Sequence, residues 1–320
     1  MTAAVEAHGL TKSFGKTKAL DGIDLVVEEG RVLGVLGPNG AGKTTAVRIL
    51  ATLLRADAGS AFVAGFDVAH QPKDVRRKIG LTGQYASVDE DLTGIQNLVM
   101  IGQLLDLSTA QARARANELL AEFDLTDAAK RLTKTYSGGM RRRLDLAASL
   151  IGRPDVVFLD EPTTGLDPAK RDDVWDMVRV LVRQGTTVLL TTQYLEEADA
   201  LANEITVIDH GRVIAHDTPQ GLKRLVGGQT LEVRASDLKD LPRIEQLLTQ
   251  VGTRAPEQPS PDLFSVPVSG EGALTSVVAT LAAEQISVSE LSLRLPSLDE
   301  VFYSLTGQRE QVADSEGKAA

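Results

Sequence analysis

Residues 37–45, GPNGAGKTT, decide the fold of this chain. They match the pattern G-x-x-x-x-G-K-[ST] and lie between an apolar run, RVLGVLG at 31–37, and an apolar helical pattern. In such a loop the backbone N–H groups from Asn39 to Thr44 surround phosphate oxygens, and Lys43 reaches the β- and γ-phosphates. The Thr44 hydroxyl is a ligand for Mg²⁺. The alternative is a plain glycine turn, but the strand–loop–helix context favours a phosphate-binding loop.

The predicted nucleotide contacts come from the whole loop and from one aromatic residue upstream. The loop residues are Gly37, Pro38, Asn39, Gly40, Ala41, Gly42, Lys43, Thr44 and Thr45. Phe14, in TKSFGK, precedes the loop at a place where its ring could stack on a purine base. The alternative interpretation of Phe14 is an ordinary core phenylalanine.

A second motif, VVFLDE at 156–161, ends an apolar strand in two carboxylates. We expect Asp160 to hold Mg²⁺ and Glu161 to polarise an attacking water molecule. Acidic residues often end strands, so the following PTTGLDP and the phosphate loop are needed to make this prediction specific. Gln84 follows the strand IGLTG, where its amide could touch the metal or its water; the alternative is a solvated loop side chain.

A third motif, TYSGGM at 135–140, begins a helical pattern. Ser137 is a good helix N-cap, and Gly138 and Gly139 leave the N–H groups of the first turn unshielded. The start of this helix is therefore a candidate anion site, although the chain already has one phosphate loop. The three arginines at 141–143 are interpreted as a solvated helix face in contact with an acidic neighbour.

Unbroken apolar runs alternate with helical patterns through the first 228 residues. Runs of this kind suit strands that are buried on both faces of a parallel sheet, and they occur at 31–37, 155–160, 186–192 and 204–211. We therefore predict a doubly wound α/β domain over residues 1–228. Residues from about 87 to 150 are nearly all helical in pattern and are predicted to form an inserted helical subdomain.

The remainder of the chain predicts a smaller domain. Two glycines at 227–228 are interpreted as a hinge, and residues 229–308 show the order β-α-β-α-β-α, which predicts a small α+β domain. This second domain carries no recognisable chemistry, so we expect it to serve assembly or partner contact. The polar residues 309–320 are predicted to form a disordered tail.

The bulk properties exclude several classes of function. The chain has 320 residues, no cysteine and a net charge of −10, so thiolate metal sites, disulfides and a broad basic surface for nucleic acid are excluded. The first residues lack the pattern of a signal peptide, and no run reaches the ~18 apolar residues of a membrane span. If the protein works at a membrane, we expect another chain to span it.

The phosphate loop, the SGGM, the FLDE strand and the GLDP segment, in this order, resemble an ATP-binding cassette ATPase over residues 1 to about 225. More narrowly, LTGQYASVDEDLTGIQNL, LLTTQYLEEAD and PSLDEVFYSLTG resemble the ATP-binding subunits of daunorubicin-resistance-type drug exporters. This resemblance implies MgATP hydrolysis at the cytoplasmic face of the cell membrane, by a peripheral subunit that pairs with a separate integral membrane permease.

The resemblance also implies a reason for the two predicted anion sites, at the loop 37–45 and at residues 137–139. Cassettes of this family dimerise head to tail, so Ser137, Gly138 and Gly139 of one subunit would bind the γ-phosphate held by the other. Asp167, in GLDP, would lie at the dimer seam. The motif departs from the family pattern at Tyr136 and Met140, which are common in the drug-exporter branch.

A larger departure follows LLTT, where the family has a switch histidine and this chain has Gln193. None of the four histidines is placed to substitute for it. The Gln193 amide can donate a hydrogen bond to the γ-phosphate but carries no titrating proton. The alternative is that Gln193 merely caps the following helix.

Three other functions remain open from the sequence. The same ATPase could drive transport of lipid, glycan or another cargo, which motifs near the phosphate site cannot distinguish. A soluble cassette protein acting on nucleic acid is disfavoured by the single cassette and the acidic charge. A cassette that binds ATP without hydrolysis is disfavoured by Glu161 and kept open by Gln193.

Overall fold

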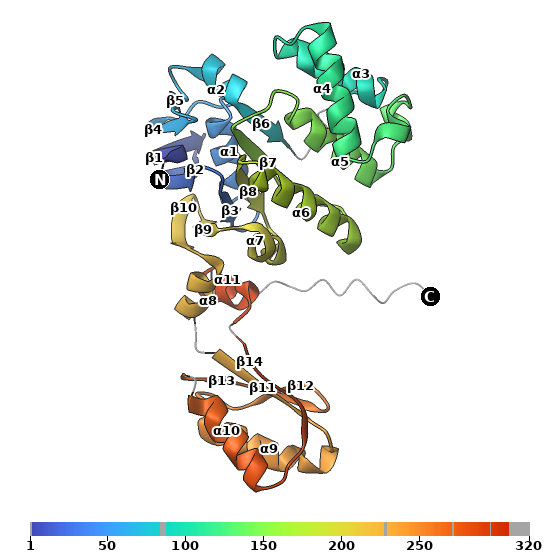
Figure 1. Ribbon diagram of the computed structural model, residues 1–320. Coiled ribbons are helices and arrows are strands. Elements are labelled where there is room, and N and C mark those ends of the chain that lie inside the picture. The colour runs from blue at the N-terminus through green and yellow to red at the C-terminus, as the bar shows by residue number, and fades with distance from the viewer. Residues whose placement is uncertain (1, 84–87, 227–228, 271, 295, 307–320) are drawn as a thin grey trace, which may run out of the picture. The chain divides into compact units, whose positions relative to one another are not determined.

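The computed structural model describes residues 2–83, 88–226, 229–270, 272–294 and 296–306 (Figure 1). It divides into two compact units, Met1–Pro219 and Gln220–Ala320. The division falls a few residues before the boundary at 228 that the sequence predicts. The predicted hinge at 227–228 and the predicted tail at 309–320 lie outside the described residues.

A six-stranded sheet forms the centre of the first unit, and it confirms the predicted α/β fold. Its strands, in spatial order, are β10 (Arg212–Asp217), β9 (Glu204–Asp209), β3 (Val32–Leu36), β8 (Thr187–Thr192), β7 (Val156–Asp160) and β6 (Ile79–Thr82). All neighbours pair in parallel except β10, which is antiparallel to β9. Every residue of β3, β7 and β8 is buried, as expected for strands covered on both faces.

A second, antiparallel sheet covers part of this unit, and the sequence analysis did not predict it. Its strands, in spatial order, are β2 (Thr17–Glu28), β1 (Ala3–Phe14), β4 (Ala58–Val63) and β5 (Phe66–Asp67). Burial alternates along much of β2, so its apolar residues do not form a continuous run. Leu20 and Ile23 of β2 share one hydrophobic core with Ile49 and Phe158.

Helices complete the first unit. Those that flank the sheets are α1 (Lys43–Leu50), α2 (Pro72–Lys78), α6 (Pro168–Arg183) and α7 (Leu195–Leu201). The inserted helices are α3 (Gly94–Leu104), α4 (Thr109–Glu122) and α5 (Gly138–Ser149), joined by 3₁₀ turns at Thr126–Ala128 and Thr133–Thr135. Figure 1 shows α3, α4 and α5 gathered to one side of the sheet, which confirms the predicted helical insertion. Capping boxes at Thr93 and Ser108 define where α3 and α4 begin.

The second unit contains a split β-α-β fold. Its elements are α8 (Pro219–Val226), β11 (Gln229–Ala235), a 3₁₀ turn (Leu238–Asp240), α9 (Leu241–Val251), β12 (Glu257–Ser260), β13 (Leu263–Val268), α10 (Gly272–Ala283), β14 (Val288–Arg294) and α11 (Leu298–Thr306). The strands lie in the order β12-β13-β11-β14, all antiparallel. This is the ferredoxin-like arrangement. From β11 onward, the sequence predicted every helix and strand except β12, a short exposed edge strand that contains Pro259. Helix α8 was not predicted.

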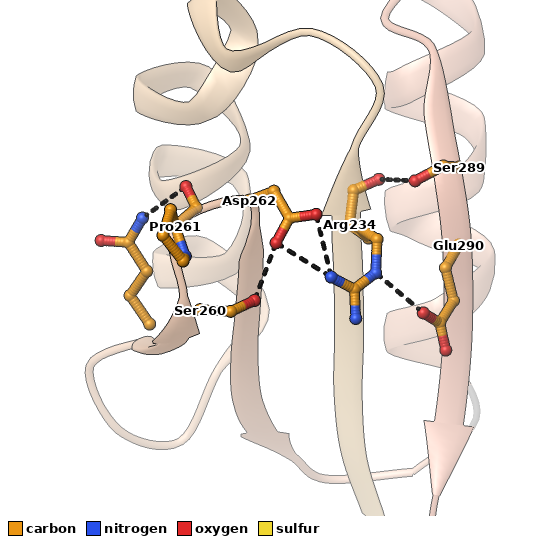
Figure 2. Close-up of polar contacts among 7 residues, drawn as sticks. Arg234, Ser260, Pro261, Asp262, Ser289 and Glu290 are labelled. Atoms are coloured by element: carbon orange, nitrogen blue, oxygen red, sulfur yellow. Dashed lines mark hydrogen bonds and ion pairs between the residues drawn. The ribbon is translucent and has the colours of Figure 1, made fainter.

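One face of this second sheet is apolar and the other is a network of ion pairs. Figure 1 shows α9 and α10 on the same side of the sheet, where Leu231 and Val233 of β11 enter the core. On β11, Arg234 Nη1 donates to both carboxylate oxygens of Asp262 at 2.9 Å, and Arg234 Nε donates to Glu290 Oε2 of β14 at 3.1 Å (Figure 2). The Arg234 guanidinium holds the pKa of Asp262 below its usual value. The positive charge of Arg234 is thus paired with the carboxylates of Asp262 and Glu290.

None of the helices that the structure describes combines the length and the apolar composition that a membrane span requires.

Substitution of Phe158 tests the packing of the hydrophobic core in the first unit. Its side chain in β7 is fully buried, so Phe158→Ala is expected to lower the free energy of unfolding by about 3–5 kcal/mol. The matched control is Phe62→Ala on β4, where 37% of the residue is exposed and the expected loss is below about 1 kcal/mol. Trp175, the single tryptophan, reports unfolding of this unit by fluorescence in a denaturant titration. Equal losses for both variants would contradict this account of the core.

Candidate active site

The loop between β3 and α1 approaches its surroundings so closely that two of its positions require glycine. A Cβ atom on Gly37 would lie 2.2 Å from the carbonyl oxygen of Ile208. Gly42 has a φ of 111°, and its Cβ would lie 2.4 Å from the carbonyl oxygen of Ala19. Gly42 is the N-cap of α1, and as a glycine it has no side chain to accept a hydrogen bond from the first-turn N–H groups of the helix. Asn39 and Gly40 form the exposed part of the loop.

Lys43 lies inside this loop. Its Nζ donates to the carbonyl oxygen of Gly37 at 2.6 Å and to that of Pro38 at 3.1 Å, and only 5% of the residue is exposed. Burial lowers the pKa of Lys43, while the carboxylates of Glu161 and Asp160 oppose this effect. The structure therefore places an ammonium group under the loop that is predicted to bind phosphate, next to the two predicted acidic residues.

Asp160 and Thr44 come together from different elements. Asp160, at the end of β7, is 5% exposed. Its Oδ1 accepts hydrogen bonds from Thr191 Oγ1 at 2.5 Å and from Thr44 Oγ1 at 3.2 Å. A carboxylate and a hydroxyl are the hard oxygen ligands that Mg²⁺ prefers, and Mg²⁺ typically binds one or two carboxylates plus substrate phosphates. The residues present therefore fit Mg²⁺.

Glu161 follows Asp160 and is held in an unusual backbone conformation. Its φ of 53° lies in the left-handed region, which non-glycine residues seldom adopt. Its N–H donates to the carbonyl oxygen of Thr191 at 3.0 Å and contacts Thr191 Oγ1 at 3.2 Å. Its Oε2 accepts a hydrogen bond from Thr164 Oγ1 at 3.2 Å. Strain of this kind tends to occur at functional sites, where the surrounding structure imposes it.

Ser137 begins α5 as predicted, and its hydroxyl accepts a hydrogen bond from the Met140 N–H at 3.3 Å. Ser137 and Gly138 are exposed, and Gly139 is half-buried. Within the described part of the chain, the candidate anion site at residues 137–139 is not hydrogen-bonded to the phosphate loop 37–45 of the same chain.

The remaining candidate residues differ in how the structure places them. Phe14 is 52% exposed on β1, with Lys12 Nζ 5.8 Å from its ring centre, so the alternative of a core phenylalanine is wrong. Gln193 follows β8 and is half-buried; the N-cap of α7 is Tyr194, so the alternative that Gln193 caps this helix is also wrong. Asp167 caps α6 by accepting from the Lys170 N–H at 3.1 Å.

Thr45 and Gln84 are the last two residues that the sequence predicts for the site. Thr45, in the first turn of α1, is half-buried. Gln84 lies outside the described residues, which end before it at Gly83 and resume at Val88. Its predicted contact with the metal or its water stays a prediction.

Two important contacts were missed by sequence reasoning. Thr191, which donates to Asp160, is signalled only by two threonines at the end of an apolar run. Arg142 was interpreted as part of a solvated face, and this is wrong because its guanidinium donates to three backbone carbonyls. Its neighbour Arg141 does contact an acidic residue, Glu90, at 2.7 Å.

A cavity of about 670 Å³ lies elsewhere in this unit. Its lining includes Asp155, Thr186 and Thr187, which stand at the start of β7 and β8. The phosphate loop follows the opposite end of β3, and all three strands run in parallel. The cavity is therefore at the other edge of the sheet and is separate from the candidate active site.

Comparison with known proteins decides the family. A family model described as ABC transporter matches residues 20–164. The chain is 58% identical over 319 residues to the daunorubicin resistance ATP-binding protein DrrA2 of Streptomyces coeruleorubidus, covering 99% of this chain and 98% of that protein. This chain belongs to the daunorubicin-resistance family of ABC transporter ATP-binding proteins. As a member of that family it is an ABC-type ATPase coupled to transport.

Other relatives of this ABC ATPase agree. It is 54% identical over 307 residues to the daunorubicin/doxorubicin resistance ATP-binding protein DrrA of Streptomyces peucetius, covering 96% of this chain and 93% of that protein. Its fold is similar to the crystal structure of an ATP-binding cassette of an ABC transporter in its ADP conformation, with a TM-score of 0.64 and 24% identity. That likeness covers 69% of this chain and 93% of the other. The cassette fold and ATP binding predicted from the motifs are thus confirmed.

The hydrogen bond from Thr191 to Asp160 gives a test specific to this ABC ATPase. Thr191→Val keeps the shape of the side chain but leaves a buried carboxylate oxygen without this donor, at an expected cost of about 1–3 kcal/mol in unfolding free energy. Because the donor also orients Asp160, we expect the Mg²⁺ concentration for half-maximal ATPase activity to rise. Thr191→Ser keeps the hydroxyl and serves as the control, with a smaller change in both measurements. An unchanged Mg²⁺ dependence in Thr191→Val would show that this contact does not orient Asp160.

Proposed function

We propose that Lys43, Thr44 and Asp160 neutralise charge on MgATP while Glu161 polarises the attacking water. The observation that carries this proposal is the junction at Asp160, where the Thr44 hydroxyl from the phosphate loop meets the carboxylate from β7. Bound Mg²⁺ would supply electrostatic stabilisation of the transferring phosphoryl group. Phosphoryl transfer depends mainly on positioning and on charge stabilisation, and these residues provide both.

The same proposal includes a homodimer with two shared sites. Ser137 and Gly138 are exposed at the start of a twelve-residue helix. Among the described residues, no hydrogen bond joins them to the phosphate loop of their own chain. A helix N-terminus stabilises an anion by about 1 kcal/mol, and by more when water is excluded. We place Gly139 with them against the γ-phosphate of a second copy, and Asp167 at the seam between the copies.

Three further side chains have proposed roles at the nucleotide. The exposed ring of Phe14 is available to stack on adenine. Gln193 follows the strand that carries Thr191, so its amide is proposed to donate to the γ-phosphate. Gln84 is proposed to contact Mg²⁺ or its water.

The proposed cargo is a drug-like amphipathic compound. Two relatives that align over nearly the whole chain are named for resistance to daunorubicin or to daunorubicin and doxorubicin. We propose that this chain acts as a peripheral subunit at the cytoplasmic face of the cell membrane and powers export through a separate integral membrane permease. The second unit is proposed to serve assembly or contact with that partner rather than catalysis.

Glu161→Gln tests the chemistry. The amide cannot act as a base, so ATP binding is expected to persist while hydrolysis falls by at least about 100-fold, the usual scale for loss of general base catalysis. Because ATP then stays uncleaved, the closed dimer should accumulate and be visible by size-exclusion chromatography with ATP. Glu196→Gln, at an exposed position of α7, is the control and should behave as wild type. A wild-type rate in Glu161→Gln would assign the base to another residue.

The cargo is tested in inverted membrane vesicles that contain the permease. Wild-type protein is expected to drive ATP-dependent uptake of doxorubicin, and Glu161→Gln protein is not. Vesicles with the permease alone give the background. ATP hydrolysis without drug uptake would point to lipid, glycan or another cargo for the same ATPase.

The shared site is tested by mixing two inactive variants. Lys43→Ala damages the phosphate loop, and Gly138→Asp places a negative charge at the anion site of α5. Each variant alone lacks an intact site, whereas a mixed dimer has one site built from the undamaged halves. We therefore expect ATPase activity to return on mixing, up to about a quarter of the wild-type rate because half of the dimers are mixed and each has one of two sites. Mixed dimers proven by crosslinking but without activity would contradict the shared site.

A further inference from the structure

Arg142 on α5 joins the helical insertion to two loops of the active site. Its Nε donates to the carbonyl oxygen of Pro162 at 2.6 Å, its Nη1 to that of Gly83 at 3.1 Å and its Nη2 to that of Glu161 at 3.3 Å. The guanidinium group therefore uses all three of its nitrogen atoms on backbone oxygens. A lysine could not reproduce this pattern, since its single ammonium group lacks the planar fork of donors.

The contact with Glu161 matters because this residue has a strained backbone. A left-handed conformation is unfavourable for a non-glycine residue and persists only where neighbouring groups impose it. The N–H of Glu161 is fixed by the carbonyl oxygen of Thr191 at 3.0 Å, and its C=O is fixed by Arg142. Residue 161 is thus held on both sides, by β8 and by α5.

The charge on Arg142 is held among buried acidic groups. Burial lowers the pKa of Arg142, and the carboxylates of Asp145, Glu197 and Asp160 oppose this. Glu197 on α7 is fully buried, and its Oε1 accepts a hydrogen bond from Trp175 Nε1 of α6 at 3.2 Å. Burial raises the pKa of Glu197, against the influence of nearby donors that include Trp175 and of the Arg142 charge. Arg142 therefore lies in a polar environment to which α6 and α7 also contribute.

We propose that Arg142 is a positioning residue for hydrolysis: it holds the carbonyl side of residue 161 and so fixes the Glu161 carboxylate relative to the phosphate loop. Arg142 contacts backbone oxygens rather than the reacting atoms, so it acts through Glu161. The inference rests on the proposed role of Glu161 as the group that polarises water. It assigns to α5 a task within its own chain, besides the proposed contact with the partner's nucleotide.

The decisive measurement is the steady-state ATPase kinetics of Arg142→Gln. Misplacement of a catalytic group by about 1 Å can cost ~100-fold, so we expect the turnover number to fall by about 10- to 100-fold. The KM for ATP should stay within about twofold, since the phosphate loop is untouched. Arg143→Gln is the matched control, because this adjacent arginine donates to the Phe123 carbonyl and to Asp124 inside the helical insertion. It should keep the wild-type turnover number.

A conservative variant keeps the proposal testable if Arg142→Gln does not fold. Arg142→Lys keeps the positive charge in the buried cluster but not the three hydrogen bonds, so we expect a turnover number between those of wild type and Arg142→Gln. Rates are normalised to folded protein by far-UV circular dichroism, because Trp175 contacts Glu197 in the cluster around Arg142. A wild-type turnover number in folded Arg142→Gln overturns the inference. If Arg142→Gln does not fold, a wild-type turnover number in Arg142→Lys overturns it.

A double variant separates positioning of Glu161 from positioning of the N-terminus of α5. Glu161→Gln alone should form the ATP-dependent dimer, and Arg142→Gln/Glu161→Gln should form it equally well if Arg142 acts on residue 161. Loss of the dimer in the folded double variant would mean that Arg142 places Ser137 instead, which overturns the inference. A wild-type rate in Glu161→Gln would refute the proposed function itself, whereas an inactive Glu161→Gln beside a fully active Arg142→Gln refutes only the inference.

Discussion

The hydrogen bond from Thr191 Oγ1 to Asp160 Oδ1 is the contact on which the candidate active site depends. It exists because β7 and β8 pair in parallel with Asp160 opposite Thr191, so that both strands end at the same edge of the sheet. Next to β8, β3 pairs Leu36 with Thr192 and delivers the phosphate loop to that edge. One strand register thus brings together the loop, the carboxylates and the hydroxyl that orients them. A slip of β7 by one residue would turn the Asp160 side chain to the opposite face of the sheet.

The parts of the fold that the sequence predicts are those with a local signature. Strands β3, β7 and β8 are buried on both faces and therefore appear as continuous apolar runs, and the phosphate loop is defined by glycines that no other residue could replace. The antiparallel sheet around β1 and β2 was missed because only one side of each strand enters the core. Strand β12 was missed because an exposed edge strand needs no apolar residues at all.

The residues of the candidate site also fall into those that a local motif predicts and those that only the fold reveals. Lys43, Thr44 and Asp160 are predictable because their chemistry follows from motifs of a few residues. Thr191 and Arg142 act through contacts with residues 31 and 19–59 positions away in the chain, and such contacts follow from the fold and not from local pattern. An arginine in a run of three is ordinarily solvated, and only the packing of α5 against the loops after β6 and β7 shows that the middle one is not.

The contacts of α5 give the proposed dimer a specific mechanical property. Its first turn presents Ser137 and Gly138 to solvent, and its second turn holds the carbonyl of Glu161 through Arg142. A rigid-body movement of this twelve-residue helix would displace its first turn and Arg142 together. In a head-to-tail dimer the first turn would contact the partner's nucleotide while Arg142 acts on the chain's own base. Binding of ATP at one shared site would then bear directly on the geometry of the other, without any change in the sheet that holds the two carboxylates.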